Sequence, residues 1–341
     1  MKHNIKFYNA INNIPQNTPP IWFMRQAGRY HSHYQALRKK HSFVELCKTP
    51  ELAAEVALGP INDFDYDAAI LFSDILFPLE SLGLKLDYKP GPIFENYLTK
   101  DLLSRYNSKG IISDNMSFQY EALRLTRSYL PADKSLVGFV GGPWTLFSYG
   151  SNIKNDIKVT KFKDELFTEK VLYDILCPNL SSIIEKQLDN GAEIVYLFDT
   201  NAKQLEKDYF ITKYMQELKN QIFSIYPNKV AYFCKDNPIL GNYSSNEDYN
   251  LAGMVYGKND GLTSLLPKIN TGFIQGNFDP KHLLKSQSEF ESYMRSFVDQ
   301  MSSLSNEERS GWICSLNHGV LPKSKEENVT HFIKTIRENF K

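Results

Sequence analysis

The sequence predicts an α/β fold and, within that class, a single-domain (β/α)8 TIM barrel that spans residues 1–341. Short apolar runs alternate with stretches in which apolar residues recur at helical spacing. About eight such units follow one another, with a period of roughly 40 residues. The apolar runs are continuous, as in strands buried on both faces of a parallel sheet. An open doubly wound sheet is the alternative, but Gly28 stands alone where its glycine-rich loop would be expected.

Eight apolar runs are expected to form the strands of the barrel. They are residues 21–24, 67–72, 136–140, 193–198, 230–233, 251–255, 272–275 and 312–316. The first run ends abruptly at Arg25, and the sixth and seventh are the weakest by composition. Each run is followed by a turn signal or a helical pattern, which favours parallel strands joined by crossover helices.

Capping signals and periodicity place helices between these strands. Thr49, Pro50 and Glu51 are typical of a helix start. Ser324 with Glu327 predicts a capping box at the start of the last helix. Pro178 is expected to kink a helix over residues 166–188, which ends at Asn190 and Gly191. Further helices are expected at residues 33–40 and 118–130, and near 209–225, 262 and 290–304.

Residues 80–117 interrupt this pattern and are expected to form a loop insertion. The segment is rich in glycine, proline and polar residues, among them Gly83, Pro90 and Pro92. Such residues mark turns and loops. Within the segment, residues 84–88 predict a short additional strand.

Composition limits the classes of function. Lys plus Arg and Asp plus Glu both number 39, so the formal net charge is zero, which argues against a nucleic-acid binder that works through bulk basicity. No apolar run approaches the length of a membrane span. The four cysteines lie far apart and residues 1–17 are polar, which is typical of a cytoplasmic protein with reduced thiols.

Polar residues stand where several of the expected strands end, and this end of a barrel carries function. They are Arg25, Arg29, Asp74, Tyr149, Asp199, Thr200, Asn277 and His318. Singly, each has a common structural explanation, such as a solvated loop, a helix cap or a turn. As a set they place a carboxylate opposite arginines. Such a site can hold an anionic substrate and stabilise a cation that forms on it.

Other chemistries find little support among these residues. His318 has only Cys314 as a neighbouring metal ligand, and one such pair is a weak signal for zinc. The sequence contains no nucleophile elbow and no Ser-His-Asp signature. We therefore expect no metal site.

Seven segments of the chain resemble the uroporphyrinogen decarboxylase family. Residues 24–30, Met-Arg-Gln-Ala-Gly-Arg-Tyr, look like the first signature of that family, and residues 68–76 are similar to the second. The remaining blocks match in the right order, at residues 45–53, 138–145, 198–200, 275–280 and 318–322. The resemblance spans essentially the whole chain.

This resemblance implies a cofactor-free decarboxylase of porphyrin biosynthesis with a (β/α)8 fold, assembled as a homodimer. The family converts the four acetate side chains of uroporphyrinogen III to methyl groups, giving coproporphyrinogen III and CO2. By position, Asp74 resembles the acid that binds the pyrrole N–H groups. Arg25 and Arg29 match arginines that bind substrate carboxylates, and one of the two is a candidate proton donor. The other positions that match substrate-binding residues are Gln26, Ala27, Gly28, Arg38, Tyr149, Thr200 and His318.

The chain departs from the family pattern at Asn317, at Lys203, near Cys234 and near Tyr256. None of these departures touches Asp74 or the two arginines. Two other functions stay open. One is a zinc-dependent corrinoid or thiol methyltransferase of the same superfamily, and the other is a tetrapyrrole-binding protein without turnover.

Overall fold

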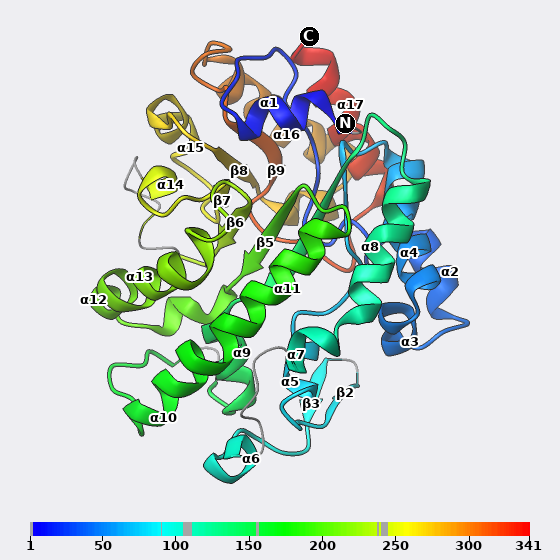
Figure 1. Cartoon of the computed structure of the whole chain (residues 1–341). Helices are drawn as coiled ribbons and strands as arrows, with labels where there is room; N and C mark the ends of the chain where they lie inside the picture. The colour runs from blue at the N-terminus through cyan, green and yellow to red at the C-terminus, as the bar shows by residue number, and fades with distance from the viewer. Residues whose placement is uncertain (1–2, 90, 105–110, 155–156, 237–238, 240–244) are drawn as a thin grey trace.

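The centre of the fold is a parallel sheet of seven strands in the order β1-β4-β5-β6-β7-β8-β9 (Figure 1). The computed structural model describes residues 3–89, 91–104, 111–154, 157–236, 239 and 245–341. The strands are β1 Ala68–Ile70, β4 Ser135–Gly141, β5 Ile194–Phe198, β6 Val230–Phe233, β7 Gly253–Val255, β8 Phe273–Phe278 and β9 Trp312–Leu316. Seven of the eight expected runs therefore contain a strand, and their residues are almost all buried.

The segment expected to be the first strand occupies the eighth place in the barrel without forming a regular ladder. Ile21 makes an isolated parallel bridge to Cys314. The Cys314 N–H donates to the Pro20 carbonyl and the Asp67 N–H donates to the Ile21 carbonyl, both at 2.9 Å. The prediction of a regular strand was wrong here, because Pro20 has no N–H to donate and the chain turns away at Arg25, whose φ is 62°. The segment still lies between β9 and β1 and closes the barrel.

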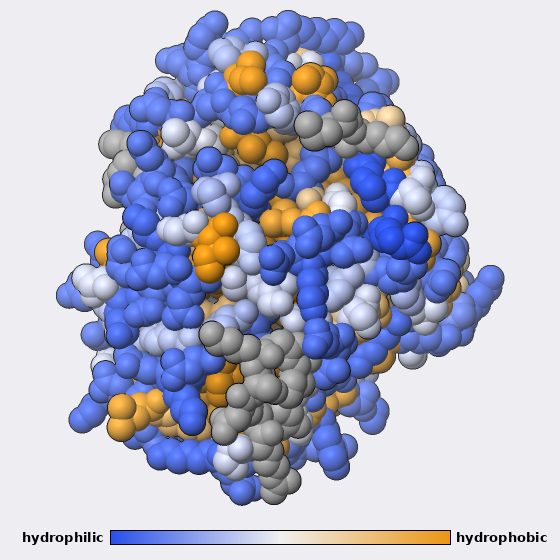
Figure 2. All heavy atoms as spheres, viewed as in Figure 1, coloured by the Kyte–Doolittle hydropathy of each residue, from blue (hydrophilic) through white to orange (hydrophobic). Residues whose placement is uncertain are grey.

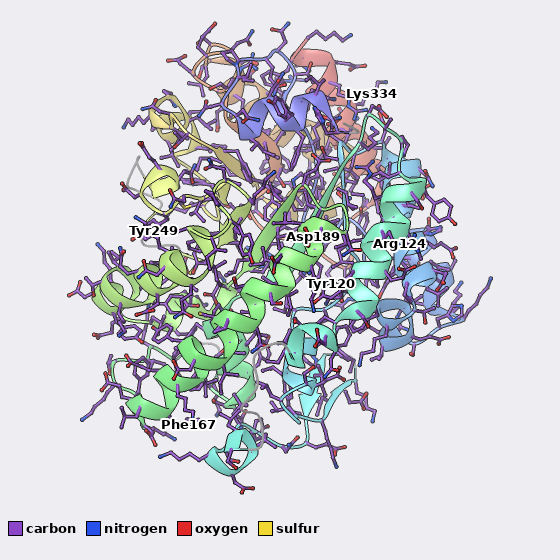
Figure 3. The ribbon with its side chains drawn as sticks, viewed as in Figure 1. Tyr120, Arg124, Phe167, Asp189, Tyr249 and Lys334 are labelled. Carbon is purple, nitrogen blue, oxygen red and sulfur yellow. The ribbon has the colours of Figure 1, made fainter. Side chains whose placement is uncertain are left out.

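Helices cover the outside of the sheet. The principal ones are α2 Ser32–Arg38, α4 Pro50–Phe64, α8 Ser117–Tyr129, α11 Cys177–Asp189, α16 Gln287–Ser302 and α17 Glu326–Asn339. Figure 3 shows Arg124 and Asp189 pointing outward from α8 and α11, and both are exposed. The face seen in Figure 2 is largely hydrophilic, with apolar groups scattered over it. Among the described residues, no helix is both long enough and apolar enough to cross a bilayer.

Shorter elements complete the chain. They are α1 Ile5–Ile11, α3 Phe43–Lys48, α5 Phe77–Glu80, α6 Lys100–Ser104, α7 Ile111–Asp114, α9 Pro143–Gly150, α10 Glu165–Glu169, α12 Lys207–Tyr209, α13 Met215–Leu218, α14 Ser245–Asp248 and α15 Leu262–Leu265. The remaining elements are 3-10 or π helices: η1 Lys170–Leu176, η2 Thr200–Gln204, η3 Phe210–Tyr214, η4 Lys219–Phe223, η5 Leu266–Lys268 and η6 Pro280–Leu284. The sequence did not predict α1 or α3.

The π-helical turns explain how the chain accommodates Pro178. The expected helix over residues 166–188 consists of α10, η1 and α11, and Pro178 lies in the first turn of α11, directly after η1. Proline cannot donate the backbone hydrogen bond of a continuous helix, and a wider turn before it relieves this loss. The helix ends as expected, with Asn190 at the C-cap and Gly191 at a φ of 108°.

The expected capping box at Ser324 is wrong. The last helix begins two residues later, at Glu326, with Lys325 at the N-cap. The Lys325 N–H donates to the Leu283 carbonyl at 3.0 Å, and the Ser324 hydroxyl is buried without a hydrogen-bond partner among the described residues. Tertiary contact with η6 therefore sets the start of α17, whereas Ser42 in α3 and Ser286 in α16 do form capping boxes.

The segment expected as an insertion contains a small antiparallel hairpin. Its strands are β2 Leu86–Tyr88 and β3 Pro92–Phe94, with Tyr88 opposite Pro92. Pro90 and residues 105–110 lie outside the described residues. Figure 1 shows the hairpin together with α6 and α10 at one end of the barrel, whereas α1 and both chain termini lie at the other end. The hairpin follows β1 and so lies at the C-terminal ends of the strands.

Candidate active site

The candidate residues lie at the C-terminal ends of the barrel strands, here called the rim. A cavity of about 460 Å³ lies at the opposite end, where Asp67, Lys134 and Arg337 line it. Its charged groups are already paired, for example Lys6 with Asp67 at 2.6 Å. That end of a barrel serves stability, and the rim serves function. We therefore build the site from the rim.

The loop that carries Arg25 is fixed from below by Gln26. The Gln26 side chain is fully buried; its Nε2 donates to the Ala68 carbonyl at 2.9 Å and its Oε1 accepts from the Phe23 N–H at 3.3 Å. The Tyr30 hydroxyl donates to the Gln26 carbonyl at 2.8 Å. Both polar atoms of the Gln26 amide are therefore used in hydrogen bonds that hold the loop to β1, and the side chain does not reach the rim.

Two glycines leave room for the Arg25 segment. A Cβ atom on Gly28 would lie 3.0 Å from the Arg25 carbonyl oxygen. A Cβ atom on Gly319 would lie 2.6 Å from the Arg25 Cδ, which is closer than real Cβ contacts allow. Gly319 therefore lets the arginine side chain pass close to the end of β9. Ala27, between the two arginines, packs with a small apolar cluster that includes Tyr34.

Arg25 and Arg29 form the cationic part of the rim. Neither makes an ion pair with any residue that the structure describes. Arg25 keeps solvent-accessible surface, but nearby protein displaces part of the water around its guanidinium. This desolvation, followed by repulsion from Arg29, lowers the pKa of Arg25, whereas Tyr149 and Asp74 oppose the shift. Two uncompensated guanidinium groups are typical of a site that receives carboxylates.

Asp74 follows β1 and lies within electrostatic reach of Arg25. Its Oδ1 accepts the Leu76 N–H at 2.8 Å, so the carboxylate closes a local turn. It does not cap α5, whose N-cap residue is Leu76. Burial raises the pKa of Asp74, while the Leu76 N–H, the Tyr88 hydroxyl and Arg25 lower it. The described residues contain no salt-bridge partner for Asp74. One carboxylate oxygen is thus positioned by the backbone, and the group retains capacity to accept hydrogen bonds from a ligand.

His318 lies at the end of β9, with its ring 6.0 Å from that of Phe233 in an edge-to-face arrangement. Burial lowers the pKa of His318 to about 4, with further lowering by the positive charges of Arg25 and Lys235. The imidazole is therefore neutral at neutral pH and offers hydrogen bonds without adding another charge.

The lowered pKa of His318 predicts a pH dependence of stability. Its folded pKa of about 4 lies below the ordinary 6.5, so the unfolded chain binds the proton first as pH falls. The contribution to the free energy of unfolding is present above pH 6.5 and is lost towards pH 4. After discounting for partial exposure, the loss is on the order of 2 kcal/mol.

Urea unfolding of wild type and His318→Gln at pH 7 and pH 4.5 measures this loss. We expect the wild type to lose more stability than the variant over this interval, because glutamine does not titrate. Equal losses in the two proteins would show that His318 keeps its ordinary pKa.

Tyr149, Thr200 and Arg38 reach the rim to different degrees. Tyr149 in α9 is partly buried, 6.5 Å from the Phe94 ring of the hairpin, and interacts electrostatically with Arg25. Thr200 begins η2 and is partly exposed. Arg38 ends α2, where it donates to the His41 carbonyl at 2.5 Å. Burial raises the pKa of the Tyr34 hydroxyl, and the positive charges of Arg38 and Arg29 oppose this effect.

Asp199 holds together several elements beneath the rim by hydrogen bonds. Its position at a strand end did not predict this structural role. Its Oδ1 accepts from the Thr145 N–H at 2.9 Å and hydroxyl at 2.8 Å, and its Oδ2 from the hydroxyls of Tyr214 at 2.5 Å and Tyr232 at 3.2 Å. A Cβ atom on Gly142 would lie 2.2 Å from the Asp199 Cγ. Asp199 thereby fastens α9, which carries Tyr149, to β5.

The part of the chain that the structure describes contains no group of three His, Cys, Asp or Glu side chains arranged to hold a metal ion. Cys314 is fully buried in β9, and burial raises the pKa of its thiol. Among the described residues, the pair of Cys314 and His318 lacks the third protein ligand that a zinc site needs.

Comparisons with a family model and with known proteins indicate the same family. The family model described as Uroporphyrinogen decarboxylase (URO-D) matches residues 2–339. Proteins named uroporphyrinogen decarboxylase are similar over nearly their full length. The one from Orientia tsutsugamushi is 36% identical, covering 97% of this chain and 98% of that protein. The one from Campylobacter jejuni is 35% identical and the one from Geobacter metallireducens 33%, each covering 98% of both chains.

Among solved structures, a methyltransferase from Methanosarcina mazei superposes with a TM-score of 0.71 and covers 98% of both chains. Its sequence identity is 17%, so the likeness concerns the fold alone. It supports the barrel fold.

Proposed function

The chain belongs to the uroporphyrinogen decarboxylase family, and we infer that it removes the four acetate carboxyl groups of uroporphyrinogen III as CO2. The product is coproporphyrinogen III, a step of heme biosynthesis. The match over residues 2–339 carries this conclusion. The rim supports it, because arginines without an ion pair among the described residues and a half-buried carboxylate suit a substrate with carboxylates at its edge and N–H donors at its centre.

We propose that Asp74 binds the pyrrole N–H groups at the centre of the substrate. Protonation of a pyrrole carbon makes the ring cationic, and this cation is the electron sink for the loss of CO2. An ionised Asp74 is complementary to the cation more than to the neutral substrate, which is the condition for faster chemistry. Burial of the carboxylate strengthens the interaction, because fewer water molecules screen it.

We propose that Arg25 and Arg29 hold carboxylates of the substrate and that Arg25 is the better placed of the two to donate the proton. Desolvation and the neighbouring charge of Arg29 make Arg25 easier to deprotonate than an isolated arginine. Tyr149, Thr200 and His318 complete the proposed substrate site, His318 as a neutral hydrogen-bonding group. Arg38 provides a further cation near Arg29 for an outer carboxylate.

The chain is expected to convert uroporphyrinogen stepwise to the four-carboxylate product without added cofactor. The measurement is anaerobic incubation of purified protein with uroporphyrinogen under reducing conditions, followed by separation of the products by carboxyl number. Recovery of only the starting material, from folded protein, would contradict the proposed function. Binding without turnover would instead favour a tetrapyrrole-binding protein.

We also propose that the chain works in the cytoplasm as a homodimer. The four cysteines are free and buried, as is typical of proteins in a reducing compartment. The family resemblance supports the dimer. Sedimentation of the purified protein measures its mass directly.

A further inference from the structure

Tyr88 brings the insertion hairpin to the catalytic carboxylate. Along β2, the side chains of Leu86 and Tyr88 are partly buried whereas that of Asp87 between them is exposed, so Tyr88 faces the barrel. Its ring lies 4.8 Å from that of Phe43 in α3 and 6.2 Å from that of Phe77 in α5. These two rings, contributed from both sides, fix the orientation of the tyrosine.

The Tyr88 hydroxyl is buried, and no described residue accepts a hydrogen bond from it within the usual limits of distance and angle. A buried hydroxyl without a partner is costly, so its placement calls for an explanation. The Tyr88 ring packs on Phe77, three residues after Asp74, and the interaction of the hydroxyl with the Asp74 carboxylate opposes the effect of burial on the pKa of Asp74. Burial and the negative charge of Asp74 raise the pKa of Tyr88 far above its usual value. The phenol therefore stays protonated and can act as a donor.

The groups around Asp74 have opposing effects on the pKa of its carboxylate. Arg25 from the arginine loop and the Leu76 N–H favour the ionised carboxylate, whereas Glu80 from α5 disfavours it. Glu80 is itself paired with Lys48 at 2.6 Å, which weakens its influence. Cys47 from α3 is close enough to interact with Asp74 but is held as a neutral thiol. Of the two side chains that lower the pKa of Asp74, Arg25 is charged and Tyr88 is a neutral hydroxyl donor.

We propose that Tyr88 is a positioning residue that donates its hydroxyl to Asp74 and keeps the carboxylate ionised and oriented towards the substrate. The inference rests on the proposed function, since it assigns Tyr88 a task in that same site. It makes the hairpin part of the active site: the hairpin supplies a donor that the barrel strands do not.

The test is the pH profile of kcat/KM for Tyr88→Phe, which removes the hydroxyl and keeps the ring between Phe43 and Phe77. Losing a donor raises the pKa of Asp74, so the acidic limb of the profile should move to higher pH. A hydrogen bond to a charged group corresponds to a roughly tenfold effect or more at low pH. The thermal midpoint should change little. An unshifted acidic limb in an active, folded variant would overturn the proposal.

Tyr97→Phe is the matched control, because Tyr97 lies in the same insertion but is 40% exposed. Its profile should coincide with that of the wild type. A second measurement does not depend on turnover. NMR titration of 13C-labelled aspartate, with the Asp74 signal identified in Asp74→Asn, should show a higher pKa for Asp74 in Tyr88→Phe. An unchanged titration overturns the proposal even if the wild type has no decarboxylase activity, whereas that inactivity alone overturns only the proposed function.

Discussion

Asp74→Asn is expected to abolish most decarboxylation while leaving the fold intact. Asparagine keeps an oxygen that can accept the Leu76 N–H, so the local turn after β1 should persist. It removes the negative charge that would stabilise the cationic ring. The loss of one preorganised charge in a desolvated site corresponds to about 3 kcal/mol or more, or at least about a hundredfold in kcat. Product separation by carboxyl number and a thermal unfolding curve measure the two parts of this prediction.

The control for this variant is Asp87→Asn. Asp87 is an exposed carboxylate on the hairpin that pairs with Lys89 at 2.6 Å, so its replacement should change activity little. Equal activity in the Asp74 and Asp87 variants would remove the electrostatic argument for Asp74. Unfolding of the Asp74 variant alone would show that the carboxylate acts through the turn.

Most of the barrel could be predicted from the sequence because its strands are buried on both faces. A continuous apolar run is stable in a strand that is buried on both faces. The structure has strands with the expected bounds at Val230–Phe233 and Trp312–Leu316. The same reasoning failed where a tertiary contact decides the local structure. Residues 21–24 look like a strand, yet Ile21 makes an isolated bridge to Cys314, and its carbonyl accepts a hydrogen bond from the Asp67 N–H. The start of α17 is set by the Leu283 carbonyl, which no local pattern reveals.

In the site, too, some residues could be recognised from the sequence, whereas the roles of others depend on tertiary contacts. Residues at strand ends could be recognised as candidates, because the ends of parallel strands meet at one rim. Tyr88 was missed as a part of it. Asp199 and Gly319 were recognised only by their positions, at a strand end and in a family block, without the contacts that the structure gives them. Gly319 matters for a side chain almost 300 positions earlier in the sequence, and Asp199 for hydroxyls on three different elements. Their importance follows from partners that only the folded chain brings together.

Arg25→Gln is expected to lower kcat/KM by about a hundredfold, which is comparable to the loss of a charge-assisted, bidentate contact in a desolvated site. Glutamine fits beside Gly319 but carries neither the charge nor the paired N–H donors. Arg25→Lys keeps the positive charge but loses the paired N–H donors of the guanidinium, so its kcat/KM should lie between those of Arg25→Gln and the wild type. The difference between the two variants separates the effect of charge from that of geometry.

Arg29→Gln should behave differently, because Arg25 acts on the Asp74 carboxylate, whereas the main groups that act on this carboxylate do not include Arg29. A contact that is equally strong in the ground state and the transition state changes KM and leaves kcat. We therefore expect Arg29→Gln mainly to raise KM, and Arg25→Gln to lower kcat as well. Steady-state kinetics of both variants distinguish these outcomes. If both change only KM, Arg25 is a carboxylate-binding residue and the proton comes from another group.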